Sequence, residues 1–244
     1  MRRTKIVCTI GPSTSSEERL EELMRAGMNV ARLNFSHGTH DEHAAVIERV
    51  RAISARIECA VAILQDLQGP KIRTGALENG QPVRLVDGAT LTITTRPIAG
   101  NAQIVSTTYT QLPLDVKPGD RILLDDGLME LCVVDANENE VHCQVVHGGT
   151  LKEHKGINLL GVAVSAPALT EKDRDDLRFG LLHRVDYVAL SFVRKPEDIL
   201  EAKAFIRAVL SEQGTSRPAK QAYLPPPLIA KLEKPEAVAR LDEI

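Results

Sequence analysis

Polar side chains of four kinds leave the chain within residues 29–38. This segment starts as an apolar, strand-like run and carries the guanidinium of Arg32, the amide of Asn34, the hydroxyl of Ser36 and the imidazole of His37. Such a cluster can hold an anion and a small cation together. Because α/β barrels carry their sites at the carboxyl ends of parallel strands, we interpret the segment as a buried strand that leads into a chemical site.

Charged and hydroxyl groups also follow the later strand-like runs of the chain. In chain order these groups are Asp66, Lys71 and Arg73, then Ser191 and Arg194, and finally Lys231 and Glu233. Any one of them alone is compatible with an ordinary solvated loop, because charged residues are mostly exposed wherever they occur. Their joint position after successive parallel strands instead predicts that they share one face of a barrel.

The combination of arginines, a lysine and carboxylates suits phosphoryl transfer. This reaction depends on positioning and electrostatic stabilisation, with a metal ion bridging the phosphate oxygens. Lys231 and Glu233 stand two residues apart at a strand end and are expected to point the same way. Lys231 would neutralise the moving phosphoryl group, and Glu233 would anchor Mg2+, which commonly takes one or two carboxylates plus substrate oxygens. A salt bridge between the two is the alternative, since opposite charges on one strand face often pair.

Alternating strand and helix patterns are predicted to position these groups. We expect buried strands over residues 5–10, 29–34, 60–66, 185–192 and 228–230. Capping boxes at Ser15 with Glu18 and at Thr39 with Glu42 predict helix starts, as does Thr170 with Asp173. This alternation favours parallel strands and right-handed crossovers. Since a closed barrel needs eight strands, the sequence predicts a partial barrel.

The hydrophobic period changes between about residues 75 and 166. Val83 and Leu85 alternate with polar neighbours, as do Val141 and Cys143, and no helical pattern appears before Thr170. We therefore predict an all-β module at residues 75–166, inserted into an α/β domain made of residues 1–74 and 167–244. Residues 214–227 are expected to form a Pro-rich connection of unusual length.

Composition excludes several classes of protein. The chain has 244 residues and 43% apolar residues, which is enough for a substantial core. Its 30 basic residues balance 33 acidic ones, so we expect no nucleic-acid partner. No stretch approaches the roughly 20 apolar residues of a membrane span, so a cytoplasmic protein with no membrane partner is expected. The cysteines show no metal-binding spacing and are predicted to be packed thiols: Cys8, Cys59, Cys132 and Cys143.

Six motifs resemble the pyruvate kinase family, in the family's order, and the resemblance covers essentially the whole chain except the Pro-rich segment before Leu228. They are Lys5-Ile-Val-Cys-Thr-Ile-Gly-Pro-Ser13, Ala31-Arg-Leu-Asn-Phe-Ser-His-Gly38, Asp66-Leu-Gln-Gly-Pro-Lys-Ile-Arg-Thr-Gly75, Lys155-Gly-Ile-Asn158, Ser191-Phe-Val-Arg194 and Lys231-Leu-Glu-Lys234. The resemblance implies an α/β fold in which a partial TIM (β/α)8 barrel carries a β-barrel lid domain. It also implies transfer of phosphate from phosphoenolpyruvate to ADP, giving pyruvate and ATP, the last step of glycolysis.

The resemblance also implies roles for individual residues. Arg32 and Lys231 would be catalytic and, with Ser191, bind substrate, and Glu233 would bind Mg2+. The nucleotide region would contain Asn34, His37, Arg73 and Lys155. The monovalent-cation site would consist of Asn34, Ser36, Asp66 and the carbonyl of Leu67.

One departure from the family pattern concerns K+. Potassium-dependent members carry Glu where this chain has Lys71, and Thr-Lys where it has Leu67 and Gln68. The Leu-Gln-Gly-Pro-Lys form resembles the potassium-independent branch. Because a tethered ammonium is a compact unit charge, Lys71 could replace the ion, and we expect the enzyme to work without K+.

A second departure concerns the segments that follow in the family. Relatives continue to an Ala-Arg-Gly-Asp segment whose Asp is the other Mg2+ ligand, and to the C-terminal domain. We therefore expect this polypeptide to be inactive or nearly so by itself. The homotetramer expected of the full-length family is not carried over to this chain. The alternatives are a truncated homologue that binds phosphorylated ligands or complete subunits without turnover, and a different Mg2+-dependent barrel enzyme acting on enolates.

Overall fold

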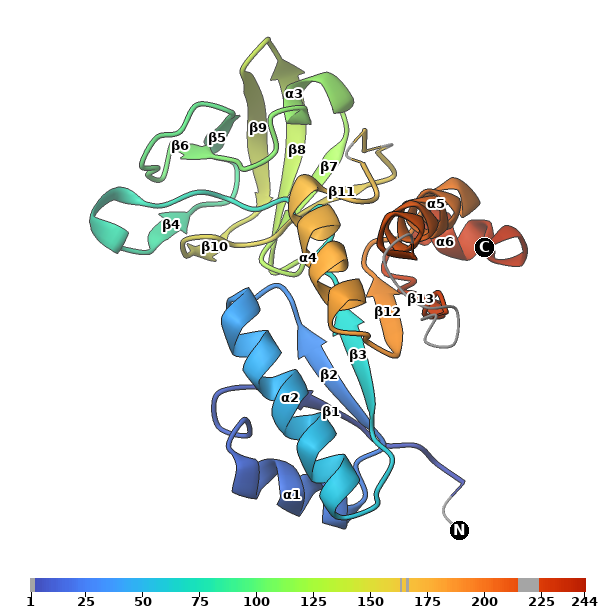
Figure 1. The fold of residues 1–244 in the computed structure, drawn as a ribbon. Coiled ribbons are helices and arrows are strands. Elements are labelled where there is room, and N and C mark those ends of the chain that lie inside the picture. Colours follow the sequence, from blue (N-terminus) through green and yellow to red (C-terminus); the bar gives the residue numbers. More distant parts are fainter. Residues whose placement is uncertain (1–2, 163, 166, 215–223) are drawn as a thin grey trace. The chain divides into compact units, whose positions relative to one another are not determined.

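The chain forms two compact units in a computed structural model that describes residues 3–162, 164–165, 167–214 and 224–244. One unit, here the α/β unit, is made of Met1–Pro70 and Pro167–Ile244. The other, here the β unit, is Lys71–Ala166. Figure 1 shows the strands and helices of each. Most of the Pro-rich connection predicted over residues 214–227 lies outside the described residues.

Strands and helices alternate along the α/β unit. In chain order the elements are β1 (Val7–Ile10), α1 (Glu17–Ala26), β2 (Val30–Asn34), α2 (His40–Arg56), β3 (Ala62–Asp66), α4 (Glu171–Leu182), β12 (Tyr187–Leu190), α5 (Pro196–Gly214), β13 (Leu228–Ala230), α6 (Pro235–Ala239) and a 3-10 turn at Leu241–Glu243. The strands form one parallel sheet in the order β1-β2-β3-β12-β13. The predicted alternation and parallel pairing are therefore confirmed.

Side-chain alternation separates the two faces of this sheet. On β2, Ala31 and Leu33 are buried in the core that the sheet shares with its helices. Arg32 and Asn34 take the intervening positions, so they point to the other face. The register places Asn34 opposite Asp66 of β3, and Asp66 opposite Ala189 of β12. The sheet thus brings polar side chains of separate strands together at its carboxyl end.

Local signals start most of these helices where the sequence predicts. Thr39 with Glu42 and Thr170 with Asp173 form complete capping boxes. The prediction for α1 is wrong by one residue, because Ser16, and not Ser15, accepts the cap bond from the Arg19 amide. Adjacent serines give the same local signal, and only the backbone geometry selects between them.

The β unit is built almost entirely from antiparallel strands. Its elements are a 3-10 turn (Glu78–Gly80), β4 (Val83–Leu85), β5 (Thr90–Thr94), β6 (Ile104–Ser106), α3 (Leu112–Asp115), β7 (Arg121–Leu124), β8 (Met129–Ala136), β9 (Glu140–His147), β10 (Gly149–Leu151) and β11 (Ile157–Leu160). They form a six-stranded sheet, ordered β11-β7-β8-β9-β5-β6, and a β10-β4 pair. Within the large sheet β5 and β6 run parallel. This unit has its own apolar core, which includes Leu91, Leu131 and Val141.

The remaining composition-based expectations concern thiols and membranes. All four cysteines are free, with Cys143 buried and the other three partly buried. Burial raises the pKa of the Cys143 thiol to about 12. No helix within the described ranges is long and apolar enough to cross a bilayer.

Candidate functional site

Asp66 holds two cationic side chains at the carboxyl end of the parallel sheet. Its Oδ2 lies 2.7 Å from Nε and 2.5 Å from Nη2 of Arg32, and its Oδ1 lies 3.0 Å from Nζ of Lys231. The Asp66 side chain is 3% exposed, whereas Arg32 and Lys231 are 30% and 26% exposed. Arg32 also donates to the Thr9 hydroxyl at 2.7 Å. Strands β1, β2 and β3 and the residue after β13 therefore meet around one buried carboxylate.

Glu233 extends this cluster to the rim of the sheet. Its Oε1 lies 3.5 Å from Nζ of Lys231, and its Oε2 accepts a hydrogen bond of 3.0 Å from the Phe192 amide. Phe192 has a φ of 55°, a left-handed conformation that is unusual for a bulky residue. Such conformations persist where the surroundings enforce them, often at binding sites. Lys231 and Glu233 point to the same side, as predicted, and both candidate roles, salt bridge and ligand site, are compatible with this geometry.

The turn after β2 carries three predicted site residues. The Ser36 amide donates to Oδ1 of Asn34 at 3.1 Å, and the His37 amide donates to the Asn34 carbonyl at 3.2 Å. The Phe35 amide donates to the carbonyl of Asp66 at 2.9 Å, which ties the turn to β3. Asn34, Ser36 and His37 therefore lie beside the Asp66 cluster.

Ser191 and Leu67 contact each other inside the α/β unit. The Ser191 hydroxyl is buried and donates to the Leu67 carbonyl at 2.5 Å. Gly69 follows with a φ of +68°, and a Cβ added there would come within 2.9 Å of the Ser191 Cβ. The backbone after β3 is thus packed directly on the end of β12. Arg194 pairs instead with Asp198 of its own helix, at 3.3 Å between Nη2 and Oδ1.

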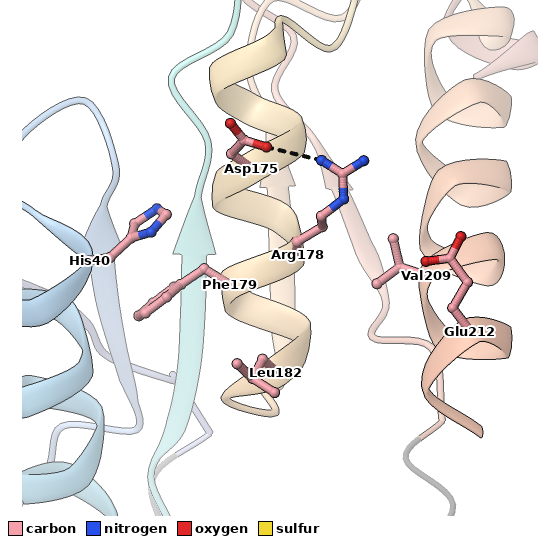
Figure 2. Close-up of a pocket in the computed structure, with 7 residues that line it drawn as sticks. All are labelled: His40, Asp175, Arg178, Phe179, Leu182, Val209 and Glu212. Atoms are coloured by element: carbon pink, nitrogen blue, oxygen red, sulfur yellow. Dashed lines mark hydrogen bonds and ion pairs between the residues drawn. The ribbon is translucent and has the colours of Figure 1, made fainter. Parts of the chain in front are cut away.

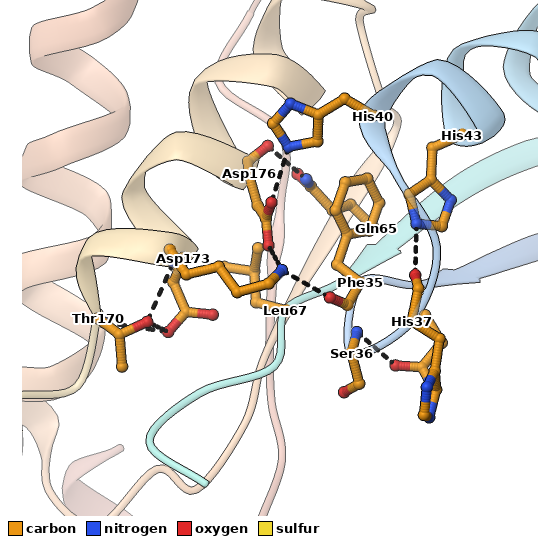
Figure 3. A network of polar contacts seen from close by, with 12 residues as sticks. Phe35, Ser36, His37, His40, His43, Gln65, Leu67, Thr170, Asp173 and Asp176 are labelled. Carbon is orange, nitrogen blue, oxygen red and sulfur yellow. Dashed lines mark hydrogen bonds and ion pairs between the residues drawn. The ribbon is translucent and has the colours of Figure 1, made fainter. Parts of the chain in front are cut away.

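A polar network behind the turn has no counterpart among the predicted site residues. Asp176 of α4 is buried, and its carboxylate lies 2.8 Å from Nε2 of His40 and 2.6 Å from Nζ of Lys172. The same lysine donates to the Phe35 carbonyl at 2.8 Å, and Gln65 donates to the Asp176 carbonyl at 2.6 Å. Figure 3 shows Asp176 between His40 and the side chain of Gln65. The spacing of Lys172 and Asp176, four apart on a helix, is the signal that could have pointed to this pair.

The other predicted residues lie in the β unit. Nζ of Lys155 pairs with Oδ1 of Asp125 at 2.9 Å. The Arg73 amide donates to the Thr108 hydroxyl, and its backbone bridges to Gly156. Lys71, at the start of this unit, accepts a hydrogen bond from the same hydroxyl at its carbonyl. These contacts describe Lys71, Arg73 and Lys155 within their own unit.

Burial lowers the pKa of two basic groups in the α/β unit. Desolvation lowers the pKa of His43, although the hydrogen bond between its Nε2 and the His37 carbonyl acts in the opposite direction. Desolvation also lowers the pKa of Lys234, whose ammonium lies 5.6 Å from the centre of the Phe192 ring. Nearby Glu236 and Glu233 partly oppose this second shift. The rim beside Glu233 is therefore a partly desolvated environment.

The donor atoms at the rim suit a metal ion that keeps other ligands of its own. Glu233 supplies an exposed carboxylate, and Mg2+ commonly binds one or two carboxylates while retaining water or substrate oxygens. No group of three or more His, Cys, Asp or Glu side chains in the described part of the chain is arranged to enclose a metal. For a monovalent cation, Oδ1 of Asp66 is a buried oxygen that accepts no hydrogen bond from the described residues. The Leu67 carbonyl and Oδ1 of Asn34 already accept hydrogen bonds, so the match to that site is partial.

A separate hollow of about 410 Å3 lies away from these cations, between α4 and the end of α5. Figure 2 shows its lining, which consists of His40, Asp175, Arg178, Phe179, Leu182, Val209 and Glu212. Arg178 pairs with Asp175 at 2.9 Å. Because this guanidinium already has a carboxylate partner, the hollow is poorly suited to phosphate.

Comparisons with known proteins give a consistent result. Residues 1–244 match the family model described as pyruvate kinase, barrel domain. The pyruvate kinase of Staphylococcus aureus strain MRSA252 is 46% identical over 246 residues, covering 100% of this chain and 40% of that protein. The protein of the same name from strain USA300 is 49% identical over 215 residues, covering 87% of this chain and 36% of its own length.

A solved structure agrees with these sequence matches. The crystal structure of a pyruvate kinase from Cryptosporidium parvum superposes with a TM-score of 0.85 at 38% identity. It covers 100% of this chain and 48% of its own chain. The chain thus spans less than half the length of the relatives it matches.

Proposed function

Because this chain belongs to the pyruvate kinase family, whose barrel-domain model it matches over residues 1–244, we propose that it forms part of a phosphoryl-transfer site. The reaction is transfer of the phosphoryl group of phosphoenolpyruvate to ADP, which yields pyruvate and ATP as the last, cytoplasmic step of glycolysis. The observation that carries the proposal is the pairing of Arg32 and Lys231 with one buried carboxylate, Asp66. Cations fixed in this way need little reorganisation when a phosphate arrives.

Each residue of the cluster has a separate task in this proposal. Arg32 binds the substrate phosphate through its guanidinium, which suits phosphate geometry. Lys231 neutralises charge on the phosphoryl group during transfer. Glu233 holds Mg2+, which supplies charge neutralisation between the phosphate oxygens when bound. Asp66 keeps Arg32 and Lys231 in place, and Ser191 supports the substrate side by fixing the backbone after β3.

The nucleotide side of the site draws on both units. We assign Asn34 and His37 of the α/β unit, and Arg73 and Lys155 of the β unit, to ADP binding. In this assignment the α/β unit is the barrel part and the β unit is the lid domain. Cationic groups from the lid would compensate the charge of the nucleotide phosphates.

We extend the proposal to the monovalent-cation requirement. Lys71 takes over the charge of K+, so the active enzyme gains nothing from KCl over tetramethylammonium chloride at equal ionic strength. A Lys71→Glu variant, which restores the residue of potassium-dependent relatives, is expected to gain a dependence on K+. A severalfold rise in the rate of the unsubstituted enzyme with KCl would contradict this part of the proposal.

The test of the main proposal is a coupled assay for pyruvate with phosphoenolpyruvate, ADP and Mg2+. It is run on the chain alone and on the chain mixed with the protein encoded immediately downstream. We expect little turnover alone, because Glu233 is the carboxylate at the rim that Asp66 does not share, and activity on mixing. Lys231→Met should abolish that activity, and Arg32→Met should weaken binding of phosphoenolpyruvate by calorimetry.

Arg178→Met is the matched control for these variants. Arg178 is paired on the surface of α4 with Asp175 and lies outside the Asp66 cluster. It should leave phosphoenolpyruvate affinity unchanged. Failure of the unsubstituted chain to bind phosphoenolpyruvate, or equal affinity in the Arg32→Met variant, would overturn the proposal.

The second candidate function is binding of phosphorylated ligands or of complete subunits without turnover. It is favoured by the small number of carboxylate donors at the rim, where Asp66 is already committed to two cations. Phosphoenolpyruvate binding without pyruvate formation under either assay condition would favour this candidate.

A further inference from the structure

The turn that follows β2 is held by its backbone, from behind. The amides of Phe35, Ser36 and His37 donate to Asp66 and Asn34. The carbonyl of Phe35 accepts from Nζ of Lys172 at 2.8 Å. Figure 3 shows the side chains of Ser36 and His37 pointing away from Asp176. The backbone of the turn is therefore bound to the protein while two of its polar side chains are free to face a ligand.

Asp176 fixes the lysine that holds this turn. Its side chain is 4% exposed, and its two oxygens bind His40 and Lys172 separately. Gln65 of β3 donates to the Asp176 carbonyl, and a Cβ added at Gly180 would come within 2.0 Å of Oε1 of Gln65. Helix α4 therefore packs on β3 at a fixed position, and this position sets where the Lys172 ammonium lies.

Stacked rings hold the other end of the turn. The Phe35 and His43 rings stack with centroids 4.1 Å apart, and His40 stacks on Phe179 at 4.4 Å. His43 also contacts the His37 carbonyl through Nε2 at 3.0 Å. Gly38 has a φ of +79°, and a Cβ added there would come within 3.3 Å of Nε2 of His43. These contacts leave the turn little freedom apart from the hold that Lys172 supplies at its centre.

We propose that Lys172 and Asp176 of α4 are positioning residues for the Phe35–His37 turn, and that they orient Ser36 and His37 toward the nucleotide. The nucleotide part of this inference rests on the function proposed above. Lys172 acts through a charge-assisted hydrogen bond to a backbone carbonyl, and Asp176 acts through Lys172. Neither residue contacts the phosphoryl-transfer cations Arg32 and Lys231 among the described contacts, so the two groups of residues should affect different ligands.

The test uses Lys172→Met in the full chain. We expect faster amide hydrogen exchange at residues 35–38, and about tenfold weaker binding of Mg-ADP, which is the loss of one hydrogen bond to a charged group at a partly exposed site. Binding of phosphoenolpyruvate should be unchanged, a split that general destabilisation would not produce. Lys172→Arg, which keeps a charged donor, should restore both exchange and Mg-ADP affinity.

Arg178→Met is the matched control on the same helix. Its side chain is 52% exposed, against 50% for Lys172, and each pairs with a carboxylate of α4. The control should leave exchange at residues 35–38 and both affinities as they are. Unchanged exchange at residues 35–38 in Lys172→Met would overturn the inference. If exchange rises but the unsubstituted chain binds no Mg-ADP, the positioning of the turn stands and the proposed function fails.

Discussion

At the scale of single residues, Asp66 matters because two cations depend on it. Its oxygens face Arg32 and Lys231 at 2.5–3.0 Å, and all three side chains are largely removed from solvent. Removing one partner of a buried ion pair is destabilising, because the remaining charge stays desolvated. We expect Asp66→Asn to lower the free energy of unfolding by about 1–3 kcal/mol, since the two cations keep partial access to water. Urea unfolding measures this.

Inorganic phosphate gives this prediction a second readout. An anion bound between Arg32 and Lys231 would replace the missing charge, so phosphate should restore more stability to Asp66→Asn than to the unsubstituted chain. Asp175→Asn is the control, because that carboxylate is 70% exposed and pairs with a surface arginine. Its effect should stay within about 0.5 kcal/mol. Equal losses in the two variants would show that Asp66 is not a shared counterion.

Residues that follow strands could be predicted to cluster, whereas the network behind them could not. Arg32, Asp66 and Lys231 each stand at the carboxyl end of a strand, and parallel strands bring such positions together. Lys172 meets the Phe35 carbonyl across 137 positions of sequence. No local pattern encodes that contact, because it depends on where α4 packs on β3. The roles of the site residues stay predictions, since they require ligands.

At the scale of elements, two capping boxes of the same design differ in burial. Glu42 caps α2 at an exposed position, whereas Asp173 caps α4 and is fully buried. Asp173 also accepts a hydrogen bond of 2.9 Å from the Gly69 amide. Loss of a cap costs about 1 kcal/mol, and an unpaired buried amide costs about 1–3 kcal/mol more.

Asp173→Ala should therefore destabilise the chain by about 2–4 kcal/mol, and Glu42→Ala by about 1 kcal/mol or less. Chemical denaturation of both variants under one buffer condition measures the difference. Asp173→Asn, which keeps an acceptor for Gly69, should fall between the two. If Asp173→Ala costs no more than Glu42→Ala, the hydrogen bond to Gly69 does not stabilise the start of α4.

Element types were more predictable than element boundaries. The predicted strand over residues 5–10 begins two residues later, at Val7, and the one over 185–192 is shorter at both ends. Apolar residues continue past the ends of these strands because they still pack on the core, as Val185 does. Hydrophobicity thus reports burial, whereas a strand also requires a paired neighbour, which the sequence does not display.

At the scale of the whole molecule, the change of hydrophobic period near residue 75 marks a change of core. The buried apolar residues of the α/β unit, such as Leu33, form one cluster. Those of the β unit, such as Leu131, form another, and no described residue belongs to both. Two cores without common members should lose their packing in separate steps, because domains with their own cores tend to unfold as units.

Matched substitutions test this directly. Leu33 and Leu131 are both at most 1% exposed, so Leu→Ala at either removes a similar contribution of about 2–5 kcal/mol. In calorimetry we expect two thermal transitions, with Leu33→Ala lowering the temperature of one and Leu131→Ala lowering that of the other. Because each cavity affects only the packing that surrounds it, the unsubstituted unit should keep its transition within the error of the measurement. A single transition that both variants lower equally would mean that the two cores unfold together.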